Sequence, residues 1–161
     1  MALRSRGPAL AATVLALAVT GSAGAHAEAT PTCGAEQVRV AVGERPAPVA
    51  NQRLFVISLA ARDGVSCVVG GALGDVRFRD AGGEHLDVPV DDAWAVPPFQ
   101  EVLVEGHRHG VVYVAAPAGG APVAPIAEIA FDLPAGGRVE AAWPAPTAGP
   151  LRFTAIVEPV S

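Results

Sequence analysis

The stretch "RLFVISLAARDGVSCVVGGALGDVRFRDAGG" (53–83) contains three runs with strand character, separated by short turns. Residues 53–61 are apolar on both faces, which is typical of a strand inside a β-sandwich. The turn at 62–64 leads into a second run at 65–69, and "DVRFR" then alternates apolar with charged residues. The glycine-rich segment at 80–84 has the composition of a hairpin turn. The stretch therefore predicts consecutive short strands of an antiparallel fold.

The rest of the chain continues this pattern of short segments bounded by proline and glycine. Further strands are predicted at 38–42, 85–90, 99–104, 110–116, 125–134, 138–143 and 151–159. Pro89 makes 85–90 an edge strand, because proline cannot donate a hydrogen bond to a central ladder. Residues 91–98 are predicted to form a loop, and the segments on either side of "EGHRH" are expected to pair as a hairpin. Residues 125–134 fit a helical stripe equally well, and their neighbours favour the strand.

The chain has neither internal repeats nor a second compositional regime. About nine short strands in one regime predict an all-β fold, an antiparallel immunoglobulin-like β-sandwich. We expect a single domain over 28–161, with its core at 33–159.

Residues 1–27 have the order of a signal peptide. Arg4 and Arg6 form a basic start, residues 9–19 are apolar, and the segment ends in an A-x-A pattern. The apolar run is shorter than the roughly 20 residues that span a membrane, so no stable anchor is expected after cleavage. The predicted cut lies between Ala27 and Glu28. A secreted, extracellular protein is therefore expected, and no lipid anchor, because the first cysteine follows well after the apolar run.

The predicted mature chain of 134 residues is acidic and contains no lysine. Removal of the two arginines of the signal peptide leaves 9 arginines against 16 acidic residues, a net charge of −7. Binding to nucleic acid rests on basic contacts with phosphates, so nucleic acid is not expected as a partner.

Two cysteines, Cys33 and Cys67, remain in the mature chain. An exported protein resides in an oxidising compartment, which favours a structural disulfide between them. Their separation of 34 residues is far from the C-x-x-C spacing of redox catalysts. Two free thiols or a redox pair stay open as alternatives.

The glycines that follow Cys67 do not form a phosphate-binding loop. A dinucleotide loop needs G-x-G-x-x-G before a helix, but Val69 occupies the position of the first glycine and a strand pattern follows. A Walker motif needs a lysine, which the chain lacks. No cofactor is expected. Gly70, Gly71 and Gly74 are instead predicted to supply positive φ or close approach between sheets.

The histidines are the candidates for a metal site. His107 and His109 are two residues apart, so on a strand they would face the same side, and Glu105 or His85 could complete a small zinc or copper site. The competing interpretation is a solvated hairpin tip between glycines, and it is favoured because only two ligands are adjacent.

No catalytic constellation is found in the sequence. Ser58 lies in an apolar strand, Ser66 lies next to a cysteine, and no nucleophile elbow is present. Asp91 and Asp92 are adjacent, which does not place two carboxylates across a cleft. We therefore expect no enzyme.

The aromatic residues offer an alternative function. Trp94, Tyr113 and Trp143 could form an aromatic platform for a sugar, although such residues more often pack in the core or at its rim.

The line from "CGAEQVRVAVG" to "RFRDAGG" resembles domain of unknown function (DUF) family 4232, secreted and lipoprotein domains of actinobacteria. The positions that match are Cys33, Cys67, Gly70, Val76, Asp80, Gly83 and the turn at 103–106. The usual second cysteine pair of that family is missing, and Ala61-Arg62 replaces its Asn-Thr turn. The resemblance implies a β-sandwich exported by a Gram-positive cell, and it brings no catalytic residues.

These observations predict a secreted, non-catalytic β-sandwich module with a structural or binding role at the cell envelope or outside the cell. The alternatives are a metal-binding protein using the histidine hairpin and a carbohydrate-binding module.

Overall fold

The computed structural model of the chain describes residues 29–119 and 122–160. The predicted signal peptide and its cleavage site at Ala27 and Glu28 lie outside these residues. Within them the chain forms one short 3₁₀ helix and thirteen strands, and no α-helix. The elements are η1 (Ala35–Gln37), β1 (Val38–Arg45), β2 (Gln52–Ala61), β3 (Ser66–Val69), β4 (Gly74–Arg79), β5 (His85–Leu86), β6 (Val90–Trp94), β7 (Val102–Glu105), β8 (His109–Pro117), β9 (Val123–Ala124), β10 (Glu128–Asp132), β11 (Arg138–Ala142), β12 (Thr147–Ala148) and β13 (Leu151–Thr154).

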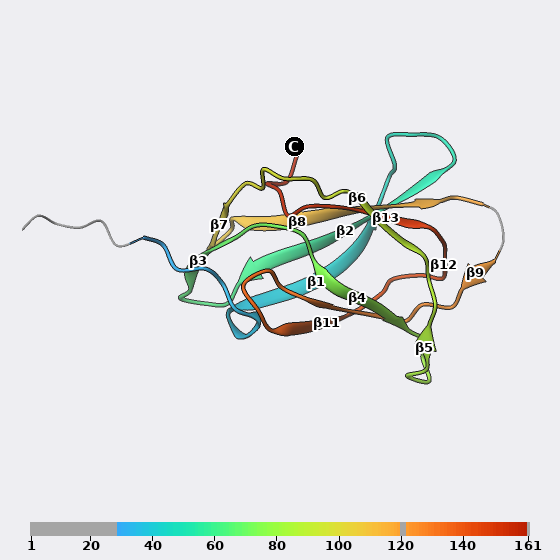
Figure 1. The fold of residues 1–161 in the computed structure, drawn as a ribbon, viewed down its shortest axis with the longest axis horizontal. Helices are drawn as coiled ribbons and strands as arrows, with labels where there is room; N and C mark the ends of the chain where they lie inside the picture. Colours follow the sequence, from blue (N-terminus) through green and yellow to red (C-terminus); the bar gives the residue numbers. More distant parts are fainter. Residues whose placement is uncertain (1–28, 120–121, 161) are drawn as a thin grey trace, which may run out of the picture.

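Two larger sheets and two strand pairs make up the molecule. The five-stranded sheet has the order β1-β2-β8-β13-β6, and the four-stranded sheet has the order β11-β10-β4-β5. In Figure 1, β6 and β13 lie toward the upper side of the molecule, and β4 and β11 lie toward the lower side. The pairs β12–β9 and β3–β7 complete the fold. This all-β architecture confirms the predicted fold class and is consistent with a β-sandwich.

The core forms where alternate residues of the two sheets face each other. Phe55 and Ile57 of β2 are fully buried, as is Phe131 of β10. Trp143 lies between the sheets, with its ring centroid 4.7 Å from that of Phe55 and 5.7 Å from that of Phe78. Because a buried indole N–H needs a partner, its Nε1 donates to Thr147 Oγ1 at 2.9 Å. The run at 53–61, predicted as an interior strand, is β2, which lies inside the five-stranded sheet between β1 and β8.

The predicted disulfide between Cys33 and Cys67 is present, with an S–S distance of 2.06 Å. Both residues are almost fully buried. The segment before β1 runs parallel to β3, since Thr32 and Val68 form a bridge and Cys33 N donates to Val68 O at 2.9 Å. The bond thus fastens the entry of the chain to β3, and the described residues hold no free cysteine.

The predicted hairpin between 99–104 and 110–116 is wrong. β7 pairs antiparallel with β3, whereas β8 pairs with β2 on one side and β13 on the other. Both edges of β8 are therefore paired with other strands, so β7 cannot form backbone hydrogen bonds along β8. A tight turn redirects the chain, in which Arg108 N donates to Glu105 O at 2.8 Å.

The loop predicted at 91–98 is wrong in its first half, because β6 extends to Trp94 and pairs parallel with β13. The edge strand predicted at 85–90 is reduced to β5, which does lie at the end of the four-stranded sheet. The chain then crosses between the sheets at Pro89, whose carbonyl accepts from Leu151 N at 2.9 Å. The ambiguous segment 125–134 contains β10, so the preference for a strand is confirmed.

Candidate binding surface

Exposed apolar side chains gather in one segment of the described chain. The large hydrophobic residues that are exposed are Val49, Val90, Trp94, Val96, Phe99, Val123 and Val160. Four of these seven fall within 90–99, which we call the 90–99 strip and define as Val90, Trp94, Val96 and Phe99. Contiguous exposed apolar surface is typical of a contact surface, whereas isolated exposed apolar residues are ordinary.

The strip is positioned by the last strand of the five-stranded sheet. β6 follows Pro89, and its register with β13 shifts between Arg152 and Thr154. Beyond β6 the backbone turns at the cis Pro97–Pro98 peptide. Prolines on both sides and an irregular register are features that discourage further strands from adding to an edge. A partner would therefore contact the side chains of the strip and would not pair with the backbone edge of β6.

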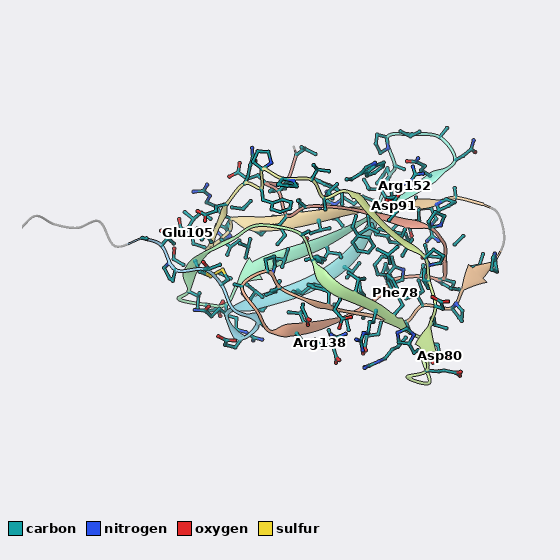
Figure 2. The ribbon with its side chains drawn as sticks, in the orientation of Figure 1. Phe78, Asp80, Asp91, Glu105, Arg138 and Arg152 are labelled. Atoms are coloured by element: carbon teal, nitrogen blue, oxygen red, sulfur yellow. A yellow bond between two sulfur atoms is a disulfide. The ribbon has the colours of Figure 1, made fainter. Side chains whose placement is uncertain are left out.

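Trp94 lies on the outer face of the sheet. Leu151 and Phe153 are buried in the core, so Arg152 and Thr154 between and beyond them face outward, and Thr154 is the register partner of Trp94. The Trp94 side chain is 49% exposed, and the guanidinium carbon of Arg152 lies 5.6 Å from its ring centroid. Arg152 Nε also lies 3.5 Å from Asp91 Oδ2, and Figure 2 labels these two side chains next to each other.

A pocket of about 200 Å³ adjoins Arg152 at the end of the same sheet. Its lining comprises Asn51, Gln52, Ala115, Ala116, Pro117, Pro150 and Arg152. Asn51 has a left-handed backbone with φ of +61°, and its carbonyl accepts from Ala118 N at 2.9 Å. Asparagine adopts the left-handed conformation more readily than most residues, so it suits the turn that leads into β2.

The three aromatic residues proposed as a platform do not come together. Trp143 is 5% exposed and belongs to the core. Tyr113 is half-buried on the outer face, where its hydroxyl accepts from Val160 N at 2.9 Å. Of the three, Trp94 alone presents an open ring, and sequence pattern offered no signal that separated it from Trp143.

His107 lies in the turn before β8, and His109 is the first residue of β8. His107 and His109 line a pocket of about 310 Å³ together with Arg108 and Glu158, which are 3.5 Å apart. His109 Nδ1 is 3.3 Å from His107 O. Glu105 instead accepts a hydrogen bond from Ser66 Oγ at 2.7 Å.

His85 lies on β5, at the end of the other sheet, and does not line this pocket. Among residues 29–119 and 122–160, no group of three or more His, Cys, Asp or Glu side chains is placed to hold a metal ion. The structure therefore brings His107 and His109 into one pocket, but it does not place Glu105 or His85 with them to hold a metal ion.

The remaining candidate residues have structural partners. Ser58 sits within β2 between Ala41 of β1 and Val111 of β8. Ser66 donates to Glu105, and the carboxylate of Asp91 faces Arg152.

The glycines after Cys67 pack against a neighbouring loop. A Cβ at Gly70 would lie 2.7 Å from Gln100 O, and Gly71 has a φ of +99°. These two confirm the predicted close approach and positive φ. A Cβ at Gly74 would make only ordinary contacts, the nearest at 3.6 Å, so the prediction is wrong for this glycine.

The outer face of the four-stranded sheet is charged and internally paired. Arg138 Nη1 lies 2.9 Å from Asp75 Oδ2, and Arg77 lies 3.0 Å from the same carboxylate. Hydrogen bonds from Arg138 and then Arg77 lower the pKa of Asp75. Arg79 reaches Glu128 at 3.1 Å. The charged groups of this face are paired with one another, whereas the exposed apolar side chains of the 90–99 strip lie on β6 and in the segment that follows it.

Comparisons with models of protein families, with curated proteins and with solved structures find no match to this chain. A search of the described residues for a helix long and apolar enough to cross a membrane finds none.

Proposed function

We propose that the chain is an exported, non-catalytic β-sandwich module that binds a component of the cell envelope through the 90–99 strip. One observation carries this proposal. Four of the seven exposed large hydrophobic residues of the described chain lie on this one segment. Exposed apolar area is costly to leave in water, so a segment with several such side chains is a candidate for a surface that a partner covers.

Export is supported by two features of the sequence and one of the fold. The order of residues 1–27 is that of a cleaved signal peptide, and the Cys33–Cys67 bond suits an oxidising compartment. The resemblance to DUF family 4232 implies the same location, and we keep that relationship as a hypothesis.

The composition of the strip supports binding rather than chemistry. Trp94 with Arg152 against its ring combines the two residue types that most often dominate binding energy at interfaces. The acid of this surface for which the structure gives a partner, Asp91, is paired with Arg152, whose Nε lies 3.5 Å from Asp91 Oδ2.

A sedimentation assay tests the proposal. The mature protein is mixed with isolated envelopes of the producing cells, and the amount retained in the pellet is measured. We expect the wild type to be retained and a Trp94→Ser/Val96→Ser/Phe99→Ser variant to lose about tenfold in affinity, because contact residues of this kind carry most of the binding energy.

The matched control is Val49→Ser/Val123→Ser, which removes two side chains that are 54% and 57% exposed elsewhere. The control should be retained like the wild type, and circular dichroism checks that all variants fold. Equal retention of the strip variant and the wild type, or loss in the control, contradicts the proposal.

The metal-binding alternative at His107 and His109 remains a weaker hypothesis, because only two of its ligands share a pocket. Isothermal titration with zinc and copper tests it. A stoichiometric submicromolar site that is lost in His107→Ala/His109→Ala would establish it in place of the strip.

A further inference from the structure

Trp94 presents the kind of surface on which a sugar ring stacks. The C–H groups on one face of a sugar ring are slightly positive and lie well against the negative face of an indole. Trp94 is half exposed, and Arg152 already stands over its ring at 5.6 Å. That contact fixes the orientation of the ring while the remaining exposed area stays open to a ligand.

The charged groups beside Trp94 form an ion pair. Arg152 Nε lies 3.5 Å from Asp91 Oδ2, and the guanidinium has further N–H donors. Their charges cancel locally, so the surface has no preference for an anion or a cation. The acidic mature chain further disfavours anionic ligands. A neutral ligand rich in hydroxyl groups matches this ion pair.

The adjoining pocket supplies two more polar side chains. Asn51 and Gln52 line it, and within the described chain their side-chain amides make no hydrogen bond to the protein. An amide presents two donors and an acceptor, which suits neighbouring hydroxyls on a sugar. The pocket, at about 200 Å³, is smaller than the roughly 300–1,000 Å³ that hold drug-sized ligands. It has room for one ring-sized unit next to Arg152.

We propose that this outer face binds a neutral carbohydrate, with Trp94 stacking on one sugar unit and Asn51, Gln52 and Arg152 contacting the hydroxyls of the next. The inference rests on the proposed function, because it shares Trp94 with the 90–99 strip, and it names the ligand class. An extended peptide added to β6 is disfavoured, since prolines at 89, 97 and 98 flank that strand and offer no N–H group for pairing.

Calorimetric titration of the disulfide-bonded mature protein tests the inference. The probes are cellotetraose, maltotetraose, chitotetraose and the neutral glycans released from isolated envelopes. We expect saturable binding of at least one probe, with the dissociation constant raised about tenfold or more by Trp94→Ala. Asn51→Gly, which keeps the left-handed backbone, and Gln52→Ala should each weaken binding severalfold.

The control is Phe99→Ala, which removes a strip residue that does not line the Asn51–Gln52 pocket. It should leave the glycan affinity unchanged. Absence of saturable binding by every probe up to about 10 mM, or equal binding by Trp94→Ala, overturns the inference.

The two proposals fail in different ways. Envelope retention that depends on the strip and is abolished by protease treatment of the envelopes, but not by glycosidases, would show a protein partner. That result overturns the carbohydrate inference and leaves the proposed function standing. Retention that does not depend on the strip overturns the proposed function itself.

Discussion

Gly70 and Gly43 differ in what surrounds the place where a side chain would begin. A Cβ on Gly70 would meet Gln100 O at 2.7 Å, closer than real Cβ atoms approach a backbone oxygen. Gly43 lies within β1, at the edge of the five-stranded sheet, and nothing lies within 4 Å of a Cβ there. The same added methyl group should therefore have opposite effects at the two positions.

We expect Gly70→Ala to lower the free energy of unfolding by about 1–3 kcal/mol, because the backbone at 100–101 must move away. Gly43→Ala should raise it by about 0.5–1 kcal/mol, since glycine loses more backbone entropy in a strand than alanine does. Urea unfolding monitored by circular dichroism measures both. Equal destabilisation by the two variants would show that the packing around Gly70 is misplaced.

At the scale of the element, β1 and β2 are joined at their outer end by an ion pair. Arg53 Nε and Nη2 donate to the two oxygens of Glu44 at 2.7 Å and 2.8 Å. The guanidinium also lies over the Phe55 ring, 4.9 Å from its centroid. The hydrogen bond from Arg53 lowers the pKa of Glu44 below its ordinary value of 4.5, against a smaller opposing effect of burial. The Arg53 side chain therefore links Glu44, near the end of β1, to the buried ring of Phe55.

Because the pKa of Glu44 is lower in the folded state, its contribution to stability is fully present above about pH 4.5. The contribution is lost as the pH falls through the folded-state pKa. We expect Glu44→Gln to lower the free energy of unfolding by up to about 1 kcal/mol at pH 7, and to converge with the wild type in acid. Thermal unfolding between pH 7 and pH 3 checks this. A difference that persists unchanged in acid would show that the ion pair is not its source.

How far the elements could be predicted depends on what specifies each of them. The strands β1, β2 and β4 carry alternating or continuous apolar runs, and local pattern is enough to identify them, whereas β10 needed the strand character of its neighbours as well. The partner of a strand is a tertiary property. The turn at 105–108 resembles a hairpin turn, yet β7 joins β3 because β8 is already paired on both edges. The strand β6 was missed because "VDDAW" has weak strand character of its own and forms against β13.

The candidate surface was only partly predictable for a related reason. Trp94 and Trp143 look alike in sequence, since both are followed closely by proline. Burial separates them, because Trp143 fills the space between Phe55 and Phe78 whereas Trp94 faces outward beside Arg152. The amides of Asn51 and Gln52 are distant in sequence from Trp94, and Arg152 brings the two sites together.

At the scale of the whole molecule, the disulfide agrees with the proposed export. The bond ties the segment before β1 to β3, so a protein that left the cell would carry its N-terminal segment fixed to the core. We expect the protein recovered from the culture medium to begin at Glu28 and to have the mass of the 134-residue chain less two hydrogen atoms. Intact mass spectrometry reads both features at once. A start at Cys33 with an added lipid mass would show an anchored protein instead.

Hydrogen exchange on the envelope-bound mature protein tests the central claim most directly, because it reports which segment is covered. Peptides that span 90–99 and 105–109 are compared with and without isolated envelopes. The second segment contains His107 in the turn and His109 at the start of β8. The account predicts slower exchange across 90–99 in the bound protein and unchanged exchange across 105–109. Protection at 105–109 alone, or no protection in either segment of retained protein, would contradict it.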